Sequence, residues 1–386
     1  MPRTDRLEAY FLAVVSNRLH GPLHSAFRSV LSALSRLYSA IMDLRLYFFE
    51  HRIARSKELG CQVISIGNLT VGGTGKTPVV EVFARALQQN GRRVAILSRG
   101  YRKKELPLSR KILNVLTFRA PEEEPPRVVS DGKSLLLDSA MGGDEPYMLA
   151  SHLPSVCVVT DKDRVKSGRY AIQKLGCDTL ILDDGFQYLR LKHRVDIVLV
   201  DATNPFDNGR VLPRGLLRES IRHLRRATFI FITKSSGDGS PELRARIREL
   251  NGHAEIAECR HTPRDFTDVY TGETHDLAFL QGKKISAVSG IAAPRGFEES
   301  LERLGAEIVA RRRFPDHHRY TQQEILDVIN EARARGADLV VTTEKDAVRF
   351  PKIERRDVPV HFLRITIELL SGAEDFNQLI QRICFK

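Results

Sequence analysis

The chain has 386 residues, 42% of them hydrophobic and 28% charged, which is typical of a folded globular protein and too long for one ordinary domain. Its net charge of +12 suits a phosphorylated substrate or an anionic surface, while the absence of Trp argues against a base-stacking surface, so no nucleic-acid partner is expected. The five cysteines contain no CxxC pair, which excludes the usual patterns of a zinc site or a disulfide framework.

The first 57 residues carry nine Lys and Arg against four Asp and Glu. Within them, apolar residues recur at helical spacing and predict an amphipathic helix. Two interpretations are open: the helix lies on an anionic membrane, or it packs on its own domain. No apolar stretch reaches the roughly 18 residues that a spanning helix needs. The stripe consists of Phe27, Leu31, Leu34, Tyr38, Ile41, Leu44 and Phe48.

From residue 61 onward, short apolar runs alternate with helix-length segments. Such runs are typical of buried strands in a mainly parallel sheet covered by helices on both faces. The sequence therefore predicts an α/β fold. The runs are Cys61–Ile66, Val94–Leu97, Val156–Thr160, Thr179–Leu182, Asp196–Val200 and Phe229–Ile232.

Two segments interrupt this alternation. The acidic and proline-rich stretch 104–132 predicts an inserted loop or hairpin, and SSGDGSP at 235–241 predicts a linker. Beyond the linker, strands near 285–289, 307–310 and 339–342 alternate with helices near 296–304 and 322–335. We therefore predict three parts: an N-terminal helical segment at 1–57, a core at 58–236 and a smaller α/β domain at 237–386.

The segment GNLTVGGTGKTP at 67–78 lies between a predicted strand and a predicted helix, which is the context of a P-loop. Gly72, Gly73, Thr74 and Gly75 form the turn whose backbone N–H groups would face phosphate oxygens. Lys76 would reach the β- and γ-phosphates, and Thr77 would offer its hydroxyl to Mg²⁺. The motif predicts binding of ATP with Mg²⁺ as cofactors, although Thr70 replaces the usual first glycine.

A second motif, TLILDDGFQ at 179–187, ends a buried strand in Asp183 and Asp184. Carboxylates at this end of a strand beside a P-loop are suited to holding Mg²⁺, directly or through water. The sequence leaves open which of the two aspartates contacts the metal. An ordinary turn after a strand would also favour Asp and Gly.

Three further groups of polar residues are candidates for the site. Asp144 and Glu145 open a predicted helix and are either first-turn acids or a base and a metal ligand. In FPDHHRY at 314–320, Asp316 could orient His317 or His318 for proton transfer, or the segment could be a polar loop. Loops after apolar strands contain arginines that could contact phosphate or a headgroup: Arg99, Arg164 and Arg218.

Together these motifs resemble the tetraacyldisaccharide 4′-kinase family of lipid A biosynthesis. The match runs in order from about residue 60 to residue 350 and is specific as a combination. The matching stretches are GNLTVGGTGKTP, SRGY at 98–101, GGDEP at 142–146, DDGFQ at 183–187, VLPRGLLRE at 211–219, SGIAAPRGFEESLERLG at 289–305, FPDHH at 314–318 and TTEKDAV at 342–348.

The resemblance implies a P-loop kinase core with a smaller C-terminal domain and an N-terminal membrane helix. It implies transfer from MgATP to the 4′-hydroxyl of an acylated glucosamine disaccharide 1-phosphate, at the cytoplasmic face of the inner membrane, by a peripheral or monotopic protein that we expect to be a monomer. It also implies that Asp144 and His317 form the base pair. The resemblance assigns phosphate and metal positions to Lys76, Thr77, Glu145, Asp183 and Asp184. Our own candidates for substrate contacts are Arg99, Tyr101, Arg164 and Arg218.

Rival functions explain less of the sequence. A partitioning ATPase with a KGGxGKT loop would need Lys where Val71 stands, and a GTPase would need Asp where Ser236 follows TKS. A basic membrane-binding module would explain the N-terminal helix and the charge but not a P-loop combined with paired aspartates.

Overall fold

The computed structural model describes residues 10, 13–15, 19–73, 75–100, 124–355 and 357–385. The chain forms two compact units, each built from separate stretches of sequence. Unit 1 comprises residues 1–99, 161–260 and 369–386, and unit 2 comprises residues 100–160 and 261–368. The boundaries of these two units differ from those of the three predicted segments. The division into three segments remains a prediction.

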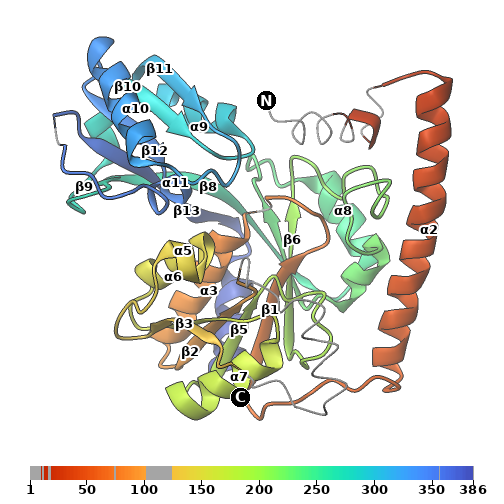
Figure 1. The fold of residues 1–386 in the computed structure, drawn as a ribbon. Helices are drawn as coiled ribbons and strands as arrows, with labels where there is room; N and C mark the ends of the chain where they lie inside the picture. Colours follow the sequence, from red (N-terminus) through yellow and green to blue (C-terminus); the bar gives the residue numbers. More distant parts are fainter. Residues whose placement is uncertain are drawn as a thin grey trace, which may run out of the picture. The chain divides into compact units, whose positions relative to one another are not determined.

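Unit 1 contains a parallel sheet in the order β8-β7-β6-β1-β5-β2. Its central strands are buried on both faces, as their continuous apolar runs predict, and the α/β fold is confirmed. In Figure 1 these strands run side by side, with α3 and α7 close to them. The strands are β1 (Gln62–Asn68), β2 (Val94–Ser98), β5 (Thr179–Asp183), β6 (Val195–Asp201), β7 (Phe229–Thr233) and the first residues of β8 (Glu255–Asp268).

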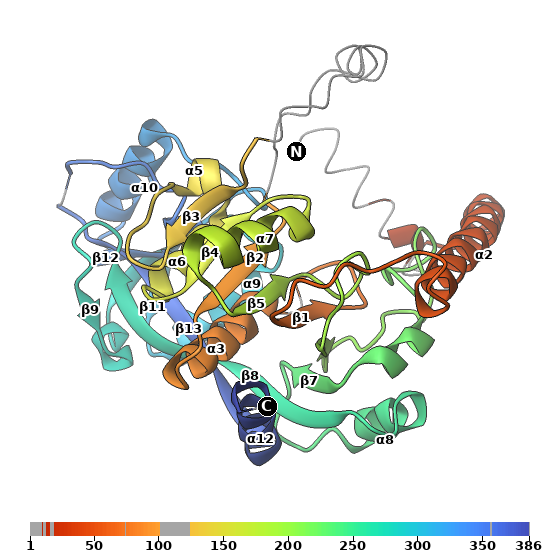
Figure 2. The ribbon, with the colours of Figure 1, turned by 90° about the horizontal axis from the view of Figure 1, so that it is seen from below.

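Aromatic side chains connect α3 with the sheet and with the last helix of the chain. Phe83 of α3 makes edge-on contacts with Phe231 of β7, at 5.7 Å between ring centroids, and with Phe376 of α12, at 4.9 Å. Figure 2 shows α12 beside α3. The helices of this unit besides α2 are α3 (Lys76–Gln89), α7 (Arg164–Leu175), the 3₁₀ helix η1 (Ile221–Arg226), α8 (Pro241–Leu250) and α12 (Ala373–Cys384).

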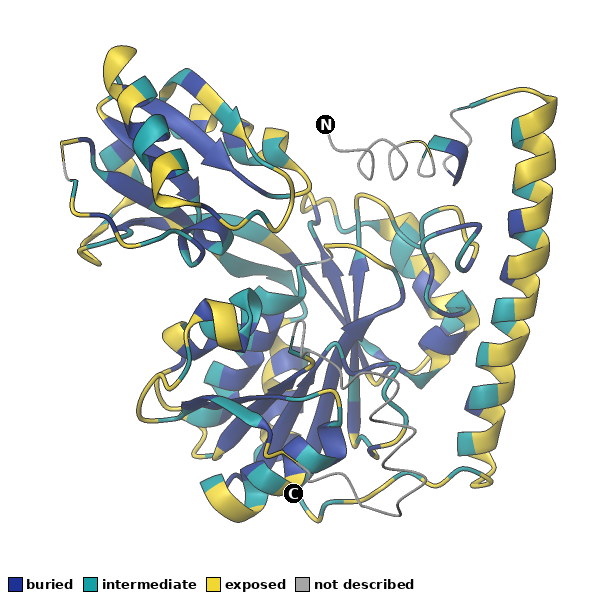
Figure 3. Ribbon diagram, viewed as in Figure 1, coloured by how far each residue is buried: buried dark blue, intermediate teal, exposed yellow. Residues whose placement is uncertain are grey.

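The predicted N-terminal helix is α2 (Pro22–Glu50), which runs along the margin of unit 1 (Figure 1). The predicted stripe needs a correction, because Leu31 is buried and Tyr38 packs inward, with its hydroxyl donating to the Arg218 carbonyl at 2.9 Å. Ser35 likewise donates to the Val211 carbonyl at 2.7 Å. Figure 3 shows that much of the helix is exposed. The outer stripe, as we call the exposed apolar residues, consists of Leu23, Phe27, Val30, Leu34, Leu37, Ile41, Leu44 and Phe48.

Unit 2 contains a parallel group of strands in the order β11-β10-β12-β13 and an antiparallel pair, β3 with β4. Its strands are β3 (Arg127–Asp131), β4 (Cys157–Thr160), β9 (Thr274–His275), β10 (Lys284–Ser289), β11 (Glu307–Arg313), β12 (Leu339–Thr343) and most of β13 (Val360–Ser371). Its helices are α5 (Ser139–Gly142), α6 (Asp144–His152), the 3₁₀ helix η2 (Leu277–Leu280), α9 (Pro294–Arg303), α10 (Gln322–Ala334) and α11 (Glu344–Ala347).

The predicted insertion at 104–132 lies largely outside the described residues, and its last part is β3. The predicted linker at 235–241 is a short irregular connection that ends where α8 begins at Pro241. The elements predicted beyond that linker are present as β10, α9, β11, α10 and β12.

A buried imidazole in unit 2 is expected to make the stability of this unit depend on pH. His361 of β13 is 2% exposed, and neither ring nitrogen has a hydrogen-bond partner among the described residues. Burial lowers the pKa of His361, helped by the nearby His275 and Lys283 and opposed by Asp268 and Glu273. Because the folded state binds its proton less readily than the unfolded state, the stability contributed by the neutral ring is lost as pH falls below the unfolded pKa of about 6.5.

We therefore expect His361→Phe to unfold at a midpoint that changes less between pH 7.5 and pH 5.5 than the wild-type midpoint does. Urea unfolding followed by circular dichroism measures this. Below pH 6.5, the slope of the free energy of unfolding against pH should differ between wild type and variant by up to about 1.4 kcal/mol per pH unit. His253→Phe is the matched control, because His253 is exposed. Equal pH dependence of wild type and His361→Phe would contradict the assignment.

Candidate active site

The phosphate loop of unit 1 starts where β1 ends at Asn68 and finishes where α3 begins at Lys76. Gly72 (φ 120°) and Gly75 (φ 77°) have backbone angles that favour glycine. A Cβ atom on Gly72 or Gly73 would meet no described atom within 4 Å, so the outer side of the turn is open. Thr74, which we predicted to bind the nucleotide, lies outside the described residues. Thr77 occupies the first turn of α3, where the helix N-terminus favours anions.

Three charged side chains meet beside this loop. Nζ of Lys76 lies 3.5 Å from Oδ1 of Asp184, and Nη1 of Arg218 donates to Oδ2 of Asp184 at 2.6 Å. Lys76 also donates to Oδ1 of Asn68 at 3.2 Å. The P-loop lysine, the second aspartate and one predicted arginine are therefore one cluster. Because two cations surround one carboxylate, the cluster as a whole carries excess positive charge, which suits a polyphosphate.

The two aspartates lie next to the loop because β5 pairs with β1, with Asp183 opposite Ile66. The approach is close: a Cβ atom on Gly67 would lie 2.8 Å from Cβ of Phe186. Asp183 is buried and accepts a hydrogen bond from the Ser98 hydroxyl at 3.0 Å. Asp184 has φ 57°, a left-handed angle that is uncommon for aspartate. Such local strain is often found where a side chain must be aimed at a ligand.

The ionisation and free oxygen of the Asp184 carboxylate fit a bound Mg²⁺. Burial would raise the pKa of Asp184, but Lys76 and Arg218 outweigh it and the pKa is lowered, so the group is a carboxylate at neutral pH. Its Oδ1 is buried and makes no hydrogen bond to any described residue. No group of three or more His, Cys, Asp or Glu that could hold a metal occurs in the described part of the chain. Mg²⁺ commonly needs only one or two carboxylates when phosphates supply further oxygens.

The remaining predicted arginines of unit 1 differ in their surroundings. Arg99 follows β2 and is exposed. Arg164 is buried, and its guanidinium donates to the carbonyls of Asp161, at 2.9 Å, and of Asp183, at 3.5 Å. This position fits support of the strand end at Asp183 better than contact with a headgroup. Tyr101, the other predicted substrate contact, lies outside the described residues.

In unit 2, the N-terminus of α6 presents Asp144 to two arginines. Arg319 donates to Oδ1 at 2.8 Å, and Arg349 donates to Oδ2 at 2.7 Å. The carboxylate is 10% exposed and the Arg349 side chain is fully buried. A carboxylate has about four acceptor positions, so two remain for a substrate hydroxyl. Neither arginine was predicted as a site residue, although Arg319 lies within FPDHHRY and Arg349 directly follows TTEKDAV.

His317 lies beside this carboxylate, as the predicted pairing requires, but a third residue takes part. Its Nδ1 is 3.7 Å from Oδ2 of Asp144, which is an ionic distance and too long for a hydrogen bond. Arg349 donates to the same Nδ1 at 3.2 Å. Nζ of Lys345 lies 3.5 Å from Nε2 of the same ring, so both ring nitrogens face a cationic side chain that can only donate. His317 also has φ 61°, a left-handed angle.

Glu145, predicted as a metal ligand, is half-exposed on α6 and lies 3.6 Å from Nζ of Lys345. Arg349 is held in place from behind by Asp346, at 3.3 Å, and Asp346 accepts the Tyr320 hydroxyl at 3.0 Å. This buried network fixes the arginine that orients Asp144. Asp346 lies inside TTEKDAV and Arg349 directly follows it, but the motif by itself does not indicate that they support Asp144.

The chain is similar to known proteins over almost its whole length. The family described as tetraacyldisaccharide-1-P 4′-kinase (LpxK) matches residues 27–384. A tetraacyldisaccharide 4′-kinase of Anaeromyxobacter dehalogenans (strain 2CP-C) is 41% identical over 360 residues, covering 92% of this chain and 90% of the relative. The same-named protein of Halothermothrix orenii is 33% identical and covers 98% of both chains. The crystal structure of LpxK from Aquifex aeolicus in complex with ATP matches with a TM-score of 0.70 at 28% identity, covering 93% of this chain and all of the other.

Proposed function

Since this chain belongs to the tetraacyldisaccharide 4′-kinase family, we propose that it transfers the γ-phosphoryl group of ATP to the 4′-hydroxyl of an acylated glucosamine disaccharide 1-phosphate. The observation that carries the chemistry is the cluster of Lys76, Asp184 and Arg218 beside the open glycine turn. It provides what a phosphoryl transferase needs most, which is positioning and neutralisation of charge.

The nucleotide is assigned to unit 1. Backbone N–H groups of the glycine turn and the N-terminus of α3 would bind the phosphates, and Lys76 would contact the β- and γ-phosphates. The Thr77 hydroxyl and one of the aspartates, Asp183 or Asp184, would hold Mg²⁺, with Glu145 as a further proposed ligand. When bound, Mg²⁺ neutralises charge that develops on the phosphates. Arg218 is suited to the charge on the transferred group.

The acceptor is assigned to Asp144 and His317. As the sugar oxygen bonds to the γ-phosphorus and the bond to the ADP oxygen breaks, the hydroxyl proton passes to the free acceptor position of Asp144. Arg319 and Arg349 hold this carboxylate in one orientation, and His317 stands beside it. The transition state of such a transfer is loose, so placement of the hydroxyl counts for more than strength of the base. Arg99 and Tyr101 are further proposed contacts of the lipid.

The direct test is a mass-spectrometric assay of purified full-length protein with MgATP and detergent-dispersed tetraacyldisaccharide 1-phosphate. The expected product is heavier by one phosphate, and ATP should be consumed only when acceptor is present. ATP hydrolysis that ignores the acceptor and responds instead to a protein partner would favour a switch ATPase and contradict the proposal.

We further propose that the protein is a monomer bound to the cytoplasmic face of the inner membrane through α2. The outer stripe repeats at alternating spacings of four and three residues, and its members are well exposed: Val30 56%, Leu37 60% and Ile41 55%. A surface helix normally turns such a stripe toward the core, so this face is suited to an apolar phase. Among the described helices, none is both long and apolar enough to cross a bilayer. An exposed apolar stripe along one side is typical of a helix that lies at a membrane interface.

We expect the triple variant Leu34→Gln, Leu37→Gln, Ile41→Gln to lose binding to vesicles of phosphatidylethanolamine and phosphatidylglycerol. Each side chain withdrawn from an apolar phase costs about 1.5 kcal/mol or more, so the partition coefficient should fall by at least about 10²-fold. Co-sedimentation measures this. The matched control, Ser29→Gln, Ala33→Gln, Ala40→Gln, changes exposed positions of the same helix outside the stripe and should still bind.

Two outcomes would contradict the membrane assignment. Unchanged co-sedimentation of the triple variant would assign binding to another surface. Alternatively, a wild-type dimer in vesicle-free solution that the triple variant dissociates would show that a second copy covers the stripe.

A further inference from the structure

A lysine outside the family's matching motifs holds the phosphate loop from the side. Nζ of Lys234 donates to the carbonyl oxygen of Gly73 at 2.9 Å and to Oδ2 of Asp201 at 2.6 Å. Gly73 and Lys234 are 161 residues apart in the chain. The contact exists because β6 pairs with both β1 and β7, which brings the carboxyl ends of the three strands to one edge of the sheet.

Asp201 is arranged to orient this ammonium group. Its Oδ1 accepts hydrogen bonds from the backbone N–H and the hydroxyl of Thr203, at 2.9 and 2.6 Å, so Oδ2 remains for Lys234. Burial would raise the pKa of Asp201, but Lys234 and Thr203 outweigh it and the pKa is lowered. The partner of Lys234 is therefore an ionised carboxylate with a fixed direction.

The backbone that carries Lys234 is also fixed and strained. Lys234 has φ 54°, a left-handed angle that costs about 1 kcal/mol for a residue with a Cβ atom. The next residue, Ser235, donates its N–H to the Cys259 carbonyl at 3.1 Å and its hydroxyl to buried Glu258 at 2.9 Å. Arg244 in turn pairs with Glu258. These contacts hold the unfavourable backbone angle of Lys234, which directs its side chain toward Gly73 and Asp201.

A fixed carbonyl in a phosphate loop has a consequence for the backbone of the turn. Because the peptide bond is planar, holding the Gly73 carbonyl oxygen fixes the ψ angle of Gly73 and restricts the conformations open to the turn. Glycine turns are otherwise costly to order, because glycine loses more backbone freedom than any other residue. An anchor that orders the turn before the nucleotide arrives should increase affinity without contacting the acceptor.

We propose that Lys234, oriented by Asp201, is a positioning residue for the nucleotide: it holds the glycine turn in the conformation that receives the phosphates. This inference rests on the proposed function only in naming the nucleotide as MgATP. It concerns binding alone, and binding can be measured without any lipid. The opposite role is a latch that must open before phosphates enter, and the two roles predict changes of opposite sign.

The test is titration of full-length protein with a fluorescent N-methylanthraniloyl derivative of ATP in the presence of Mg²⁺. Lys234→Met keeps most of the side-chain stem and removes the ammonium, and we expect its Kd to rise by about 10-fold or more, as for loss of a charged hydrogen bond. Lys234→Arg should restore most of the affinity. Asp201→Asn should weaken binding in wild type but add little in the Lys234→Met background, because the two residues act as one unit.

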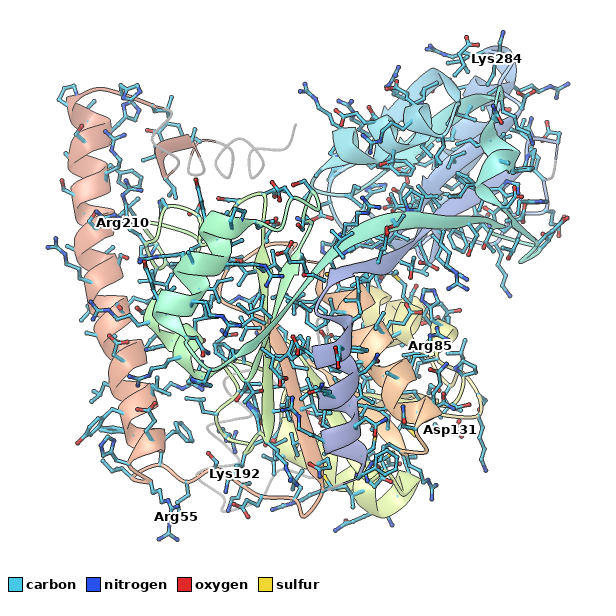
Figure 4. The ribbon with its side chains drawn as sticks, turned by 180° about the vertical axis from the view of Figure 1, so that it is seen from behind. Arg55, Arg85, Asp131, Lys192, Arg210 and Lys284 are labelled. Atoms are coloured by element: carbon cyan, nitrogen blue, oxygen red, sulfur yellow. The ribbon has the colours of Figure 1, made fainter. Side chains whose placement is uncertain are left out.

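Controls separate positioning from a structural role. Lys192→Met also removes an ammonium that pairs with a carboxylate, Glu58 at 2.7 Å, and should bind as wild type does; Lys192 is labelled in Figure 4. Thermal midpoints of the nucleotide-free variants should agree with wild type within a few degrees. In the kinase assay, Lys234→Met should raise KM for ATP and leave KM for the lipid unchanged.

Three outcomes would overturn the inference. Unchanged affinity in Lys234→Met would show that the contact has no role in binding, and tighter binding would show a latch. If the wild-type protein binds no MgATP, this inference and the proposed function fail together. If the wild type binds MgATP and Lys234→Met weakens binding while no lipid is phosphorylated, only the proposed function fails.

Discussion

Lys76→Ala is expected to lower kcat/KM for MgATP by about 10²–10³-fold, the usual effect of losing one group that neutralises transition-state charge. Lys76 is the first residue of α3, and it contacts Asp184 at Oδ1 while Arg218 contacts the other oxygen, so neither cation takes the place of the other. Without Lys76 the Asp184 carboxylate keeps one cation of two, so the cluster repels phosphate more strongly. Initial rates at varied MgATP with saturating lipid measure the change.

The loss should not come from unfolding. The Lys76–Asp184 contact is partly exposed and spans 3.5 Å, so it contributes little to stability, and the thermal midpoint should shift by only a few degrees. Lys174→Ala is the matched control, because Lys174 is an exposed lysine in the last turn of α7. A Lys76→Ala protein that turns over at the wild-type rate would remove the phosphate loop from the mechanism.

Asp144→Asn is the second variant with a large expected effect: kcat should fall by about 10²–10⁴-fold while the Kd for the ATP analogue stays at the wild-type value. The amide keeps the size of the side chain but cannot accept the hydroxyl proton. Its NH₂ group would also face one of the two guanidinium groups, which are both donors. Rates at saturating substrates, together with the fluorescence titration, separate the chemical step from nucleotide binding.

His317 provides the check on whether the pair acts together. His317→Asn alters a side chain that is 45% exposed, so it should leave folding intact. If Asp144 and His317 are one unit, the double variant should be little slower than Asp144→Asn alone. Glu299→Gln is the control, because Glu299 is an exposed carboxylate on α9 of the same unit and its loss keeps both arginine contacts of Asp144. Wild-type kcat in Asp144→Asn would refute the base assignment, and full additivity in the double variant would refute the pairing with His317.

Much of the nucleotide side of the site can be predicted from the sequence because its determinants are local. GGTGKT has to form a tight turn before a helix, and a buried apolar run must end where Asp183 and Asp184 begin. Parallel pairing of two such strands then brings both motifs to one edge of the sheet. Lys76 and Asp184 lie together within unit 1 for this reason, and Arg218, whose contact with Asp184 was not predicted, joins them. The joint action of these residues with Asp144 and Glu145 stays a proposal.

The orientation of α2 needed the structure. Periodicity indicates a helix with an apolar stripe, but α2 has apolar residues on more than one face, and the sequence does not say which face the domain covers. The polar atoms that face inward, the hydroxyls of Ser35 and Tyr38, bond to backbone carbonyls more than 170 residues away. These hydrogen bonds fix the rotation of α2 about its own axis, so that Leu31 is buried while Val30 and Leu37 are exposed.

By itself, the sequence determined the α/β class, the phosphate loop, the paired aspartates and the polar motifs, because each follows from spacing within a few residues. Only the tertiary structure decided which charges meet. Arg319 and Arg349 lie 175 and 205 residues from Asp144, and Lys234 lies 161 from Gly73. Contacts at such separations depend on strand order and on how far a side chain reaches. A single sequence does not encode either of these in any local pattern, which is why the arginines around Asp144 and the lysine behind the glycine turn were missed.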